Sequence, residues 1–172
     1  MDKPVDHGLF DSAGEETFLT GRPYREFPQP QPVESHGPAT IISMVNQKGG
    51  VGKTTSTINL GAALVEQGRK VLLVDLDPQG ALSAGLGVPH DGEQITVYDL
   101  LFDNTASIHA AIQHSNVSGL DLVPANIDLS AAEIQLVNEV GREHTLARAL
   151  RPVRGEYDYI FIDCGPSLGL LT

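Results

Sequence analysis

The sequence predicts an α/β fold in which helices cover both faces of an open parallel sheet. From residue 40 onward, short runs of apolar residues alternate with segments of helical spacing. Each run is almost continuously apolar, which is typical of parallel strands that are buried on both faces. A glycine-rich loop joins the first run to the first helical segment, and with the second run they make a βαβ unit. We therefore expect a three-layer, Rossmann-like domain.

Four apolar runs are expected to form the strands of this sheet, and they are residues 41–46, 71–77, 120–125 and 157–164. Segment 54–67 lies between the first two runs and predicts a helix, because its apolar residues fall on one helical face. Gly68 directly after this segment is a suitable helix stop. Helical spacing predicts further helices at residues 80–86, 98–102, 108–114 and 129–150.

Residues 1–39 differ from the rest of the chain and are expected to form a flexible arm. Six of the 11 prolines fall in this segment, acidic residues outnumber basic ones, and the spacing is neither helical nor that of a strand. Such a composition is typical of a solvated linker, although its aromatic residues leave a short partner-binding motif open. The expected division is therefore a proline-rich acidic arm at 1–39 and a folded domain at 40–172.

The composition limits the functions that this chain can have. Its net charge of −11 argues against a uniformly basic nucleic-acid-binding module, so any DNA contact would need a local patch. The sequence has no apolar run long enough to cross a bilayer, and its first residues lack the character of a secretory signal, so a cytoplasmic protein is expected. The single cysteine, Cys164, is expected to be a small thiol of the core.

The loop NQKGGVGKTT, at residues 46–55, predicts a phosphate-binding site. Gly49, Gly50 and Gly52 have no side chains, so successive backbone N–H groups can turn toward phosphate oxygens at the positive end of the following helix. Lys53 can neutralise β- and γ-phosphate oxygens, and the Thr54 hydroxyl is placed to ligate Mg²⁺. The alternative is a tight glycine turn that binds nothing, but the strand before it and the helix after it favour nucleotide binding. The residues expected to bind the nucleotide are Lys48, Gly49, Gly50, Val51, Gly52, Lys53, Thr54, Thr55 and Gly165.

Carboxylates follow two of the other strands, at the sheet edge where open parallel sheets bind ligands. Asp75 and Asp77 are separated by one residue and so share one face of an extended strand. Asp77 is better placed to reach a γ-phosphate, while the simpler alternative is that both carboxylates cap a helix starting near Gly80. Asp163 ends an apolar strand in the pattern of a Walker B acid, which holds Mg²⁺. Gly165 begins a turn that could contact a γ-phosphate.

The phosphate loop departs from the usual pattern. Gln47 stands where G-x-x-x-x-G-K-[ST] has a glycine, and Lys48 adds a second lysine. The stretch KGGVGKTT resembles the deviant Walker A motif of the MinD/ParA group of ATPases, which have the P-loop NTPase fold. The stretches DLDPQG and LVPANIDLS resemble the ParA/Soj partitioning branch, and the similarity extends from about residue 40 to residue 172.

The resemblance implies a role for each residue of the site. Lys48 would be the signature lysine that reaches across an ATP-bound homodimer to the phosphates of the other subunit. Lys53 would bind phosphate, while Thr54 and Asp163 would hold Mg²⁺, the carboxylate through water. Asp77 would position or activate the attacking water. The expected catalytic residues are therefore Lys48 and Asp77, and the expected cofactors are ATP and Mg²⁺.

The resemblance also implies a function for the whole protein. A ParA/Soj-type ATPase hydrolyses ATP slowly with Mg²⁺, closes as a homodimer on ATP, binds nonspecific DNA and is reset by a ParB-type stimulating protein. It is cytoplasmic and, at full length, associated with the nucleoid, with no membrane involved. Family members continue through several more strands and helices beyond the position of Thr172. We therefore expect residues 40–172 to be the N-terminal part of the ATPase domain, with a fold that is incomplete at the C-terminus.

Three alternatives stay open at this point. A MinD-like ATPase, which cycles on a membrane and positions the division site, would share the loop. A reductase of the nitrogenase iron-protein type needs two cysteines per subunit for its cluster, and Cys164 alone argues against it. A noncatalytic interaction protein could bind the nucleotide without turning it over.

Overall fold

The computed structural model describes residues 9–10, 16–17, 30–31, 33–88, 92, 94–103, 105–136 and 144–166. It divides into two compact units, Met1–Gln31 and Pro32–Thr172. In the first unit, strands β1 (Leu9–Phe10) and β2 (Glu16–Thr17) pair antiparallel. Most of the predicted arm lies outside the described residues, so its assignment stays a prediction.

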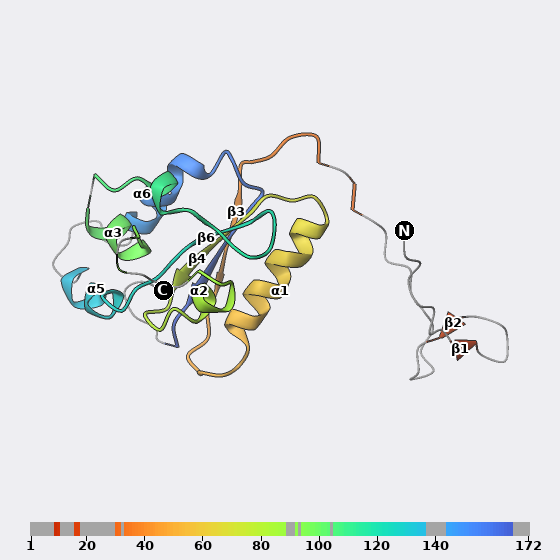
Figure 1. Ribbon diagram of the computed structural model, residues 1–172, viewed down its shortest axis with the longest axis horizontal. Helices are drawn as coiled ribbons and strands as arrows, with labels where there is room; N and C mark the ends of the chain where they lie inside the picture. Colours follow the sequence, from red (N-terminus) through yellow and green to blue (C-terminus); the bar gives the residue numbers. More distant parts are fainter. Residues whose placement is uncertain are drawn as a thin grey trace. The chain divides into compact units, whose positions relative to one another are not determined.

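The second unit is built on a five-stranded sheet in the order β3 (Thr40–Met44), β7 (Tyr159–Cys164), β4 (Val71–Leu76), β6 (Leu120–Val123) and β5 (Gln113–His114). The first four strands are parallel, and β5 pairs antiparallel with β6. This sheet confirms the predicted α/β class, and each of the four apolar runs forms one of its parallel strands (Figure 1).

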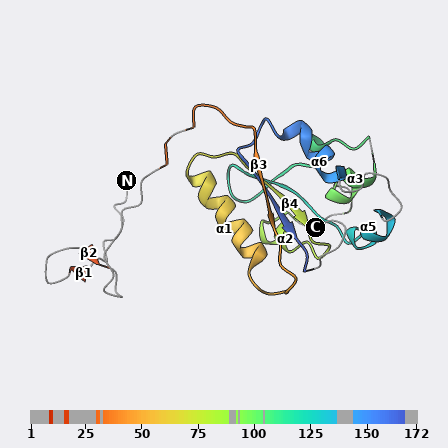
Figure 2. The ribbon, with the colours of Figure 1, turned by 180° about the vertical axis from the view of Figure 1, so that it is seen from behind.

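Helices lie on both faces of this sheet. They are α1 (Lys53–Glu66), α2 (Ala81–Gly85), α3 (Val97–Phe102), α4 (Ile108–Ala111), α5 (Leu129–Leu136), α6 (Thr145–Leu150) and the 3₁₀ helix η2 (Arg151–Val153). Helix α1 covers one face, while α3 and α6 lie on the other, as the views from the front and from behind agree (Figures 1 and 2). Within the described residues, no helix is both long enough and apolar enough to span a membrane.

Strand β4 explains why the predicted runs are almost continuously apolar. All six of its residues are buried. Val71 and Leu73 pack in a core cluster with residues of α1 and α2, whereas Leu72 and Val74 pack in a second cluster with residues of α3, α4, α5 and α6. Because successive side chains of a strand point to opposite faces, a strand between two helical layers needs apolar residues at nearly every position, and Asp75 is the exception in β4.

Helix α1 lies unusually close to the sheet at Gly61. A Cβ added at this position would lie 3.1 Å from Cδ1 of Leu120 and 3.2 Å from Cδ2 of Leu73. The helix ends at Glu66, and Gly68 follows with a φ of +74°, a left-handed conformation that favours glycine. The predicted helix and its stop signal are thus confirmed.

One predicted helix is wrong in its second half. Residues 108–114 were expected to be helical throughout, but α4 ends at Ala111 and Ile112 has extended backbone angles, with φ −68° and ψ 126°. Gln113 and His114 instead pair with Leu122 and Asp121 of β6. Pairing with a strand that is near in space outweighed the local helical preference. Of the predicted helix at 129–150, the structure describes α5 and α6 at its ends, and residues 137–143 lie outside the described residues.

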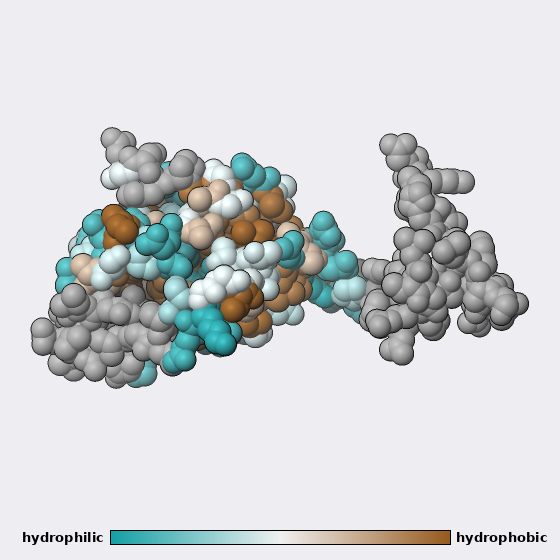
Figure 3. All heavy atoms as spheres, turned by 90° about the horizontal axis from the view of Figure 1, so that it is seen from below, coloured by the Kyte–Doolittle hydropathy of each residue, from teal (hydrophilic) through white to brown (hydrophobic). Residues whose placement is uncertain are grey.

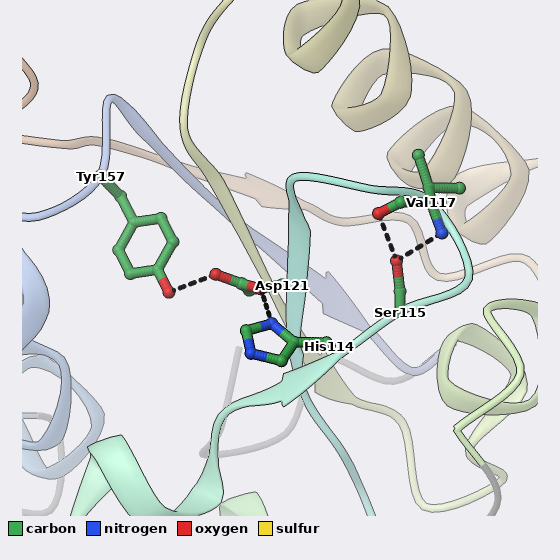
Figure 4. A network of polar contacts seen from close by, with 5 residues as sticks. All are labelled: His114, Ser115, Val117, Asp121 and Tyr157. Carbon is green, nitrogen blue, oxygen red and sulfur yellow. Dashed lines mark hydrogen bonds and ion pairs between the residues drawn. The ribbon is translucent and has the colours of Figure 1, made fainter.

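A polar network lies around β5 and β6, at one edge of the sheet (Figure 4). The Tyr157 hydroxyl donates to Oδ2 of Asp121 at 2.8 Å, and Nδ1 of His114 lies 2.7 Å from Oδ1 of the same carboxylate. The neighbouring Ser115 hydroxyl donates to the backbone carbonyl of Val117 at 3.1 Å. These contacts join β5 to β6 through His114, and β6 to the segment before β7 through Tyr157.

A second carboxylate joins the amino ends of three strands. Asp158 precedes β7 and accepts hydrogen bonds from the backbone N–H groups of Gly37 at 3.2 Å and Lys70 at 2.8 Å. Nδ1 of His36 lies 2.8 Å from its Oδ2. Burial opposes ionisation of Asp158, but these hydrogen bonds prevail and hold its pKa below the ordinary value.

Candidate functional site

The predicted phosphate loop lies at the carboxyl edge of the parallel strands. Residues 45–52 connect β3 to α1, and Figure 1 shows this loop in orange at the lower edge of the sheet. The strand register pairs Asp163 of β7 with Met44 of β3 and with Asp75 of β4. The end of β7 is therefore placed between the loop and the end of β4, which is the usual ligand position in an open parallel sheet.

The glycines leave the loop open to a ligand. Gly50 and Gly52 have φ values of +69° and +89°, in the left-handed region that favours glycine. A Cβ added at Gly49, Gly50 or Gly52 would meet no atom within 4 Å. Gly52 is also the N-cap of α1, whose 14 residues give a helix end that favours negative charge. The loop thus combines an open surface with the electrostatics that phosphate requires.

The two lysines of the loop occupy different environments. Nζ of Lys53 donates to the backbone carbonyl of Lys48 at 3.4 Å, which holds this ammonium group over the loop. Lys48 is exposed, and its backbone N–H donates to Oδ1 of Asn46 at 3.0 Å. Asn46 shapes the loop in this way, although we did not predict it. Thr55 is exposed on α1, and its backbone carbonyl accepts a hydrogen bond from Asn59 at 2.7 Å.

The loop threonine and the acid at the end of β7 are in direct contact. The Thr54 hydroxyl donates to Oδ2 of Asp163 at 2.6 Å, across 109 residues of sequence. Asp163 is only 1% exposed. Burial raises its pKa, the nearby charge of Asp77 adds to this effect, and the hydrogen bonds from the hydroxyls together with the Lys53 charge oppose it. A hydroxyl and a carboxylate held side by side are ligands that Mg²⁺ prefers.

Asp77 lies beside the same group of residues. A Cβ added at Gly165 would lie 3.6 Å from Cγ of Asp77, so the backbone after β7 and this carboxylate are neighbours. Oδ1 of Asp77 accepts the backbone N–H of Gln79 at 3.0 Å, which fixes the turn that follows β4. The structure therefore brings Asp77 and Gly165 together with Asp163, as the sequence predicted.

Asp75 has a different role from Asp77. It is fully buried and accepts hydrogen bonds from the Ser83 hydroxyl at 2.7 Å and the Ser83 N–H at 2.9 Å. The Asp77 N–H donates to its other oxygen at 3.2 Å. Burial raises the pKa of Asp75 to about 6, against the lowering effect of the three hydrogen bonds. For Asp75 the capping alternative is confirmed, because this carboxylate anchors helix α2 to the sheet.

Thr57 is a second residue of the site that was not predicted. Thr57 is completely buried on α1, and its hydroxyl lies 3.2 Å from Oδ1 of Asp163 and 3.0 Å from the backbone carbonyl of Lys53. The sequence does contain a signal for it, since Thr57 follows Thr54 by three positions and residues at this spacing share one helix face.

The donor set fits a magnesium-bound nucleotide. Among the described residues, no group of three or more His, Cys, Asp or Glu side chains could hold a metal ion by itself. A cation at Thr54 and Asp163 would therefore need phosphate oxygens and water as further ligands, which is how Mg²⁺ is usually bound in such sites. A pocket of about 450 Å³ lies elsewhere, lined by residues of α3, α4 and α6 such as Leu100, Ile108 and Arg148. Residues 45–51 of the phosphate loop are all exposed.

Apolar side chains also reach the surface at this edge. Figure 3 views the molecule from below Figure 1, the side of the phosphate loop, and shows hydrophobic residues exposed among hydrophilic ones. Val45 and Val51 of the loop are 43% and 49% exposed, and Ile127, in the segment that follows β6, is 62% exposed.

Comparisons with known proteins give a family and several relatives for this chain. A family model described as an AAA domain matches residues 39–172. An uncharacterized protein of Mycobacterium tuberculosis is 70% identical over 154 residues, which are 90% of this chain and 48% of that protein. The sporulation initiation inhibitor protein Soj of Bacillus subtilis is 53% identical over 132 residues, which are 77% of this chain and 52% of Soj. The chain spans about half the length of the curated relatives it matches.

A solved structure extends the likeness to the fold. Cobyrinic acid a,c-diamide synthase from Mycobacterium smegmatis, with a bound ATP analog and magnesium, has a TM-score of 0.73 and 47% sequence identity. The match covers 77% of this chain and 54% of that one. The name of this neighbour differs from that of Soj, as expected for a nucleotide-binding fold that serves several functions. By its family model and its relatives, the chain belongs to the AAA domain family and, within it, to the ParA/Soj type of P-loop ATPases.

Proposed function

We propose that this chain carries the nucleotide-binding part of an ATP-dependent switch ATPase that acts in chromosome or plasmid partitioning. The observation that carries the proposal is the 2.6 Å contact between the Thr54 hydroxyl and the buried Asp163 carboxylate at the end of an open glycine loop. The similarity to Soj supports the partitioning type over a MinD-like positioning ATPase.

The proposed ligands are ATP and Mg²⁺. The backbone N–H groups from Gly49 to Gly52 and the positive end of α1 bind the phosphates, with further contacts from Lys53 and Thr55. Thr54 and Asp163 are the residues that would hold Mg²⁺, the carboxylate through water. The cation, when bound, neutralises charge on the phosphate oxygens. The backbone at Gly165, which lies beside Asp77, contacts the terminal phosphate in this proposal.

Hydrolysis depends on two further residues in this proposal. Asp77 positions the attacking water, since its carboxylate lies beside Gly165 and its turn is fixed by the Gln79 N–H. Lys48 acts in trans, because its side chain is exposed while its backbone is held in the loop by Asn46. A cation from the other subunit stabilises both an ATP-bound homodimer and the charge that develops during phosphoryl transfer. The exposed Val45, Val51 and Ile127 support a subunit contact at this edge.

Other partners belong to the proposal for the longer protein. A ParB-type protein stimulates the slow ATPase, and nonspecific DNA is bound by the full-length protein rather than by this chain, whose net charge is −11. We infer a cytoplasmic protein that associates with the nucleoid at full length. The first experiment therefore uses this chain alone.

Sedimentation velocity with Mg²⁺ and either ADP or a nonhydrolysable ATP analogue tests the proposal. We expect the analogue, and not ADP, to produce a dimer of the native chain. Lys48→Ala should abolish this dimer while both nucleotides still bind, because the loop glycines and Lys53 are unchanged. Lys70→Ala is the matched control, since this exposed lysine precedes β4 at the opposite end of the sheet and should leave the dimer intact. A native chain that stays monomeric with the analogue would contradict the proposed ATP-dependent dimerisation.

A further inference from the structure

Both oxygens of the buried Asp163 carboxylate face hydroxyl groups from one face of α1. Oδ2 accepts the Thr54 hydroxyl at 2.6 Å, and Oδ1 lies 3.2 Å from the Thr57 hydroxyl. Thr57 is 0% exposed and Asp163 is 1% exposed, so bulk water does not replace either contact. The two threonines are three positions apart, and α1 packs against β7, which places both hydroxyls toward the same carboxylate.

We propose that Thr57 is a positioning residue of the magnesium site. Its hydroxyl holds the Asp163 carboxylate in one orientation, in which Oδ2 faces Thr54 and a cation bound beside Thr54. The inference rests on the proposed binding of magnesium and nucleotide, and it adds a residue that the phosphate-loop motif does not include. Carboxylates that contact a metal ion or its water are usually oriented by such outer hydrogen bonds.

The Thr57 hydroxyl also lies close to a second acceptor. Threonine in a helix often donates to the backbone carbonyl four residues earlier, and the Lys53 carbonyl is 3.0 Å away. One hydroxyl proton serves one of these acceptors at a time. Lys53 is the first residue of α1, so its carbonyl can accept a backbone N–H of the helix instead. Among the described residues, the Thr57 hydroxyl is the donor that lies within hydrogen-bond distance of Oδ1 of Asp163. Hydrogen bonds to an ionised acceptor are also the stronger ones.

Three substitutions separate the hydroxyl from the volume of the side chain. Thr57→Val keeps the shape and removes the hydroxyl, so Asp163 can rotate away from Thr54. Thr57→Ser keeps the hydroxyl and removes only the methyl group. Thr57→Ala removes the hydroxyl without placing a new methyl group against Asp163, and it serves as a second variant should Thr57→Val fold poorly.

The experiment is a titration of Mg²⁺ into the full chain with a fluorescent ADP analogue, with a parallel measurement in excess chelator. We expect Thr57→Val and Thr57→Ala to need about 10- to 100-fold more Mg²⁺ for half-maximal effect, the usual consequence of losing an outer hydrogen bond. Thr57→Ser should stay within about threefold of the native chain. In chelator, all variants should bind the analogue equally, because the phosphate loop is intact.

A further readout depends on Asp163 itself. In an Asp163→Asn background, adding Thr57→Val should not raise the Mg²⁺ requirement again, since Thr57 acts through this carboxylate. Additive effects, or folded hydroxyl-free variants with the native Mg²⁺ requirement, would overturn the inference and leave the proposed function standing. A native chain with no Mg²⁺-dependent binding of the analogue would overturn both.

Discussion

Asp75 and Asp77 are only two positions apart, yet their environments assign them different tasks. Asp75 is completely buried, and Ser83 donates two hydrogen bonds to it. Asp77 lies after the strand has ended, next to the backbone at Gly165. Alternation along a strand places both residues on one face, but the difference in depth makes one a structural anchor and leaves the other available for chemistry.

Asp77→Ala tests the assignment of the attacking-water role. The substitution should leave Mg²⁺-dependent nucleotide binding within about threefold of native, because the loop and Asp163 hold the phosphates and the cation. ATP hydrolysis should fall about 100-fold or more, as expected when a general base or water-positioning group is lost. Phosphate release and equilibrium nucleotide binding measure the two effects separately.

Asp103→Ala provides the control for this prediction. Asp103 is an exposed carboxylate that directly follows α3 and accepts hydrogen bonds from Thr105, outside the predicted site. Its replacement should leave both binding and hydrolysis unchanged. An Asp77→Ala chain that hydrolyses ATP at the native rate would contradict the attacking-water role of Asp77.

At the scale of elements, α1 holds the site together because it begins in the phosphate loop and packs tightly on the sheet. Its first five residues supply Thr54 and Thr57 to Asp163. Its middle approaches β4 and β6 at Gly61, where no side chain intervenes. The position of the first turn therefore depends on packing that occurs further along the helix.

Gly61→Val tests this close approach. The new side chain would meet Leu120 and Leu73 at contacts that are already 3.1–3.2 Å for Cβ alone. We expect a loss of about 1–3 kcal/mol in the free energy of unfolding, the usual effect of overpacking a core. Nucleotide affinity should fall as well, since α1 has to shift away from the sheet.

Urea denaturation and nucleotide binding measure these effects, with Ala63→Val as the control on the exposed side of α1. The control introduces the same β-branched residue into the same helix, so it isolates packing from helix propensity. Equal free energies of unfolding for the two variants would show that α1 can shift away from the sheet without loss of stability.

In the Pro32–Thr172 unit as a whole, the two ends of the sheet have different tasks. The carboxyl end brings together the loop, Asp77 and Asp163, which are the proposed ligand-binding residues. The amino end carries polar contacts that join strands, centred on Asp158 and on Asp121. The phosphate site depends on the register of β3, β7 and β4, and Asp158 connects the chain segments that enter these three strands.

The pKa of Asp158 predicts a dependence of stability on pH. Burial opposes its charge, but hydrogen bonds from Lys70, His36 and Gly37 lower its pKa in the folded state. The stabilisation is therefore present above the ordinary pKa of 3.8 and is lost as the pH falls through the lower folded value. Asp158→Asn should reduce the free energy of unfolding at pH 7 by about 1–3 kcal/mol.

Urea denaturation from pH 7 to pH 3 checks this prediction, with Glu66→Gln on the exposed surface of α1 as the control. The difference in the free energy of unfolding between the native chain and Asp158→Asn should narrow below pH 3.8, because Asp158 of the native chain then loses its charge as well. A difference that stays constant over this range would assign the effect of Asp158 to packing rather than charge.

The order of strands and helices around the phosphate loop, and most of the residues of the candidate site, could be predicted from the sequence. This was possible because the information is local: apolar runs identify buried strands, and contiguous residues from Asn46 to Thr55 form the whole loop. The resemblance to the ParA/Soj branch rested on the same contiguous stretches.

Contacts between residues that are distant in the sequence could not be predicted in this way. Asp163 is 109 positions from Thr54 and 106 from Thr57, so their contacts follow from the pairing of β7 between β3 and β4 and from the packing of α1. The strand at Gln113–His114 forms because β6 offers an unpaired edge, which outweighs the local helical pattern. The burial of Asp75 depends on α2 folding back over β4. Each of these outcomes is set by contacts across the chain, which local periodicity does not contain.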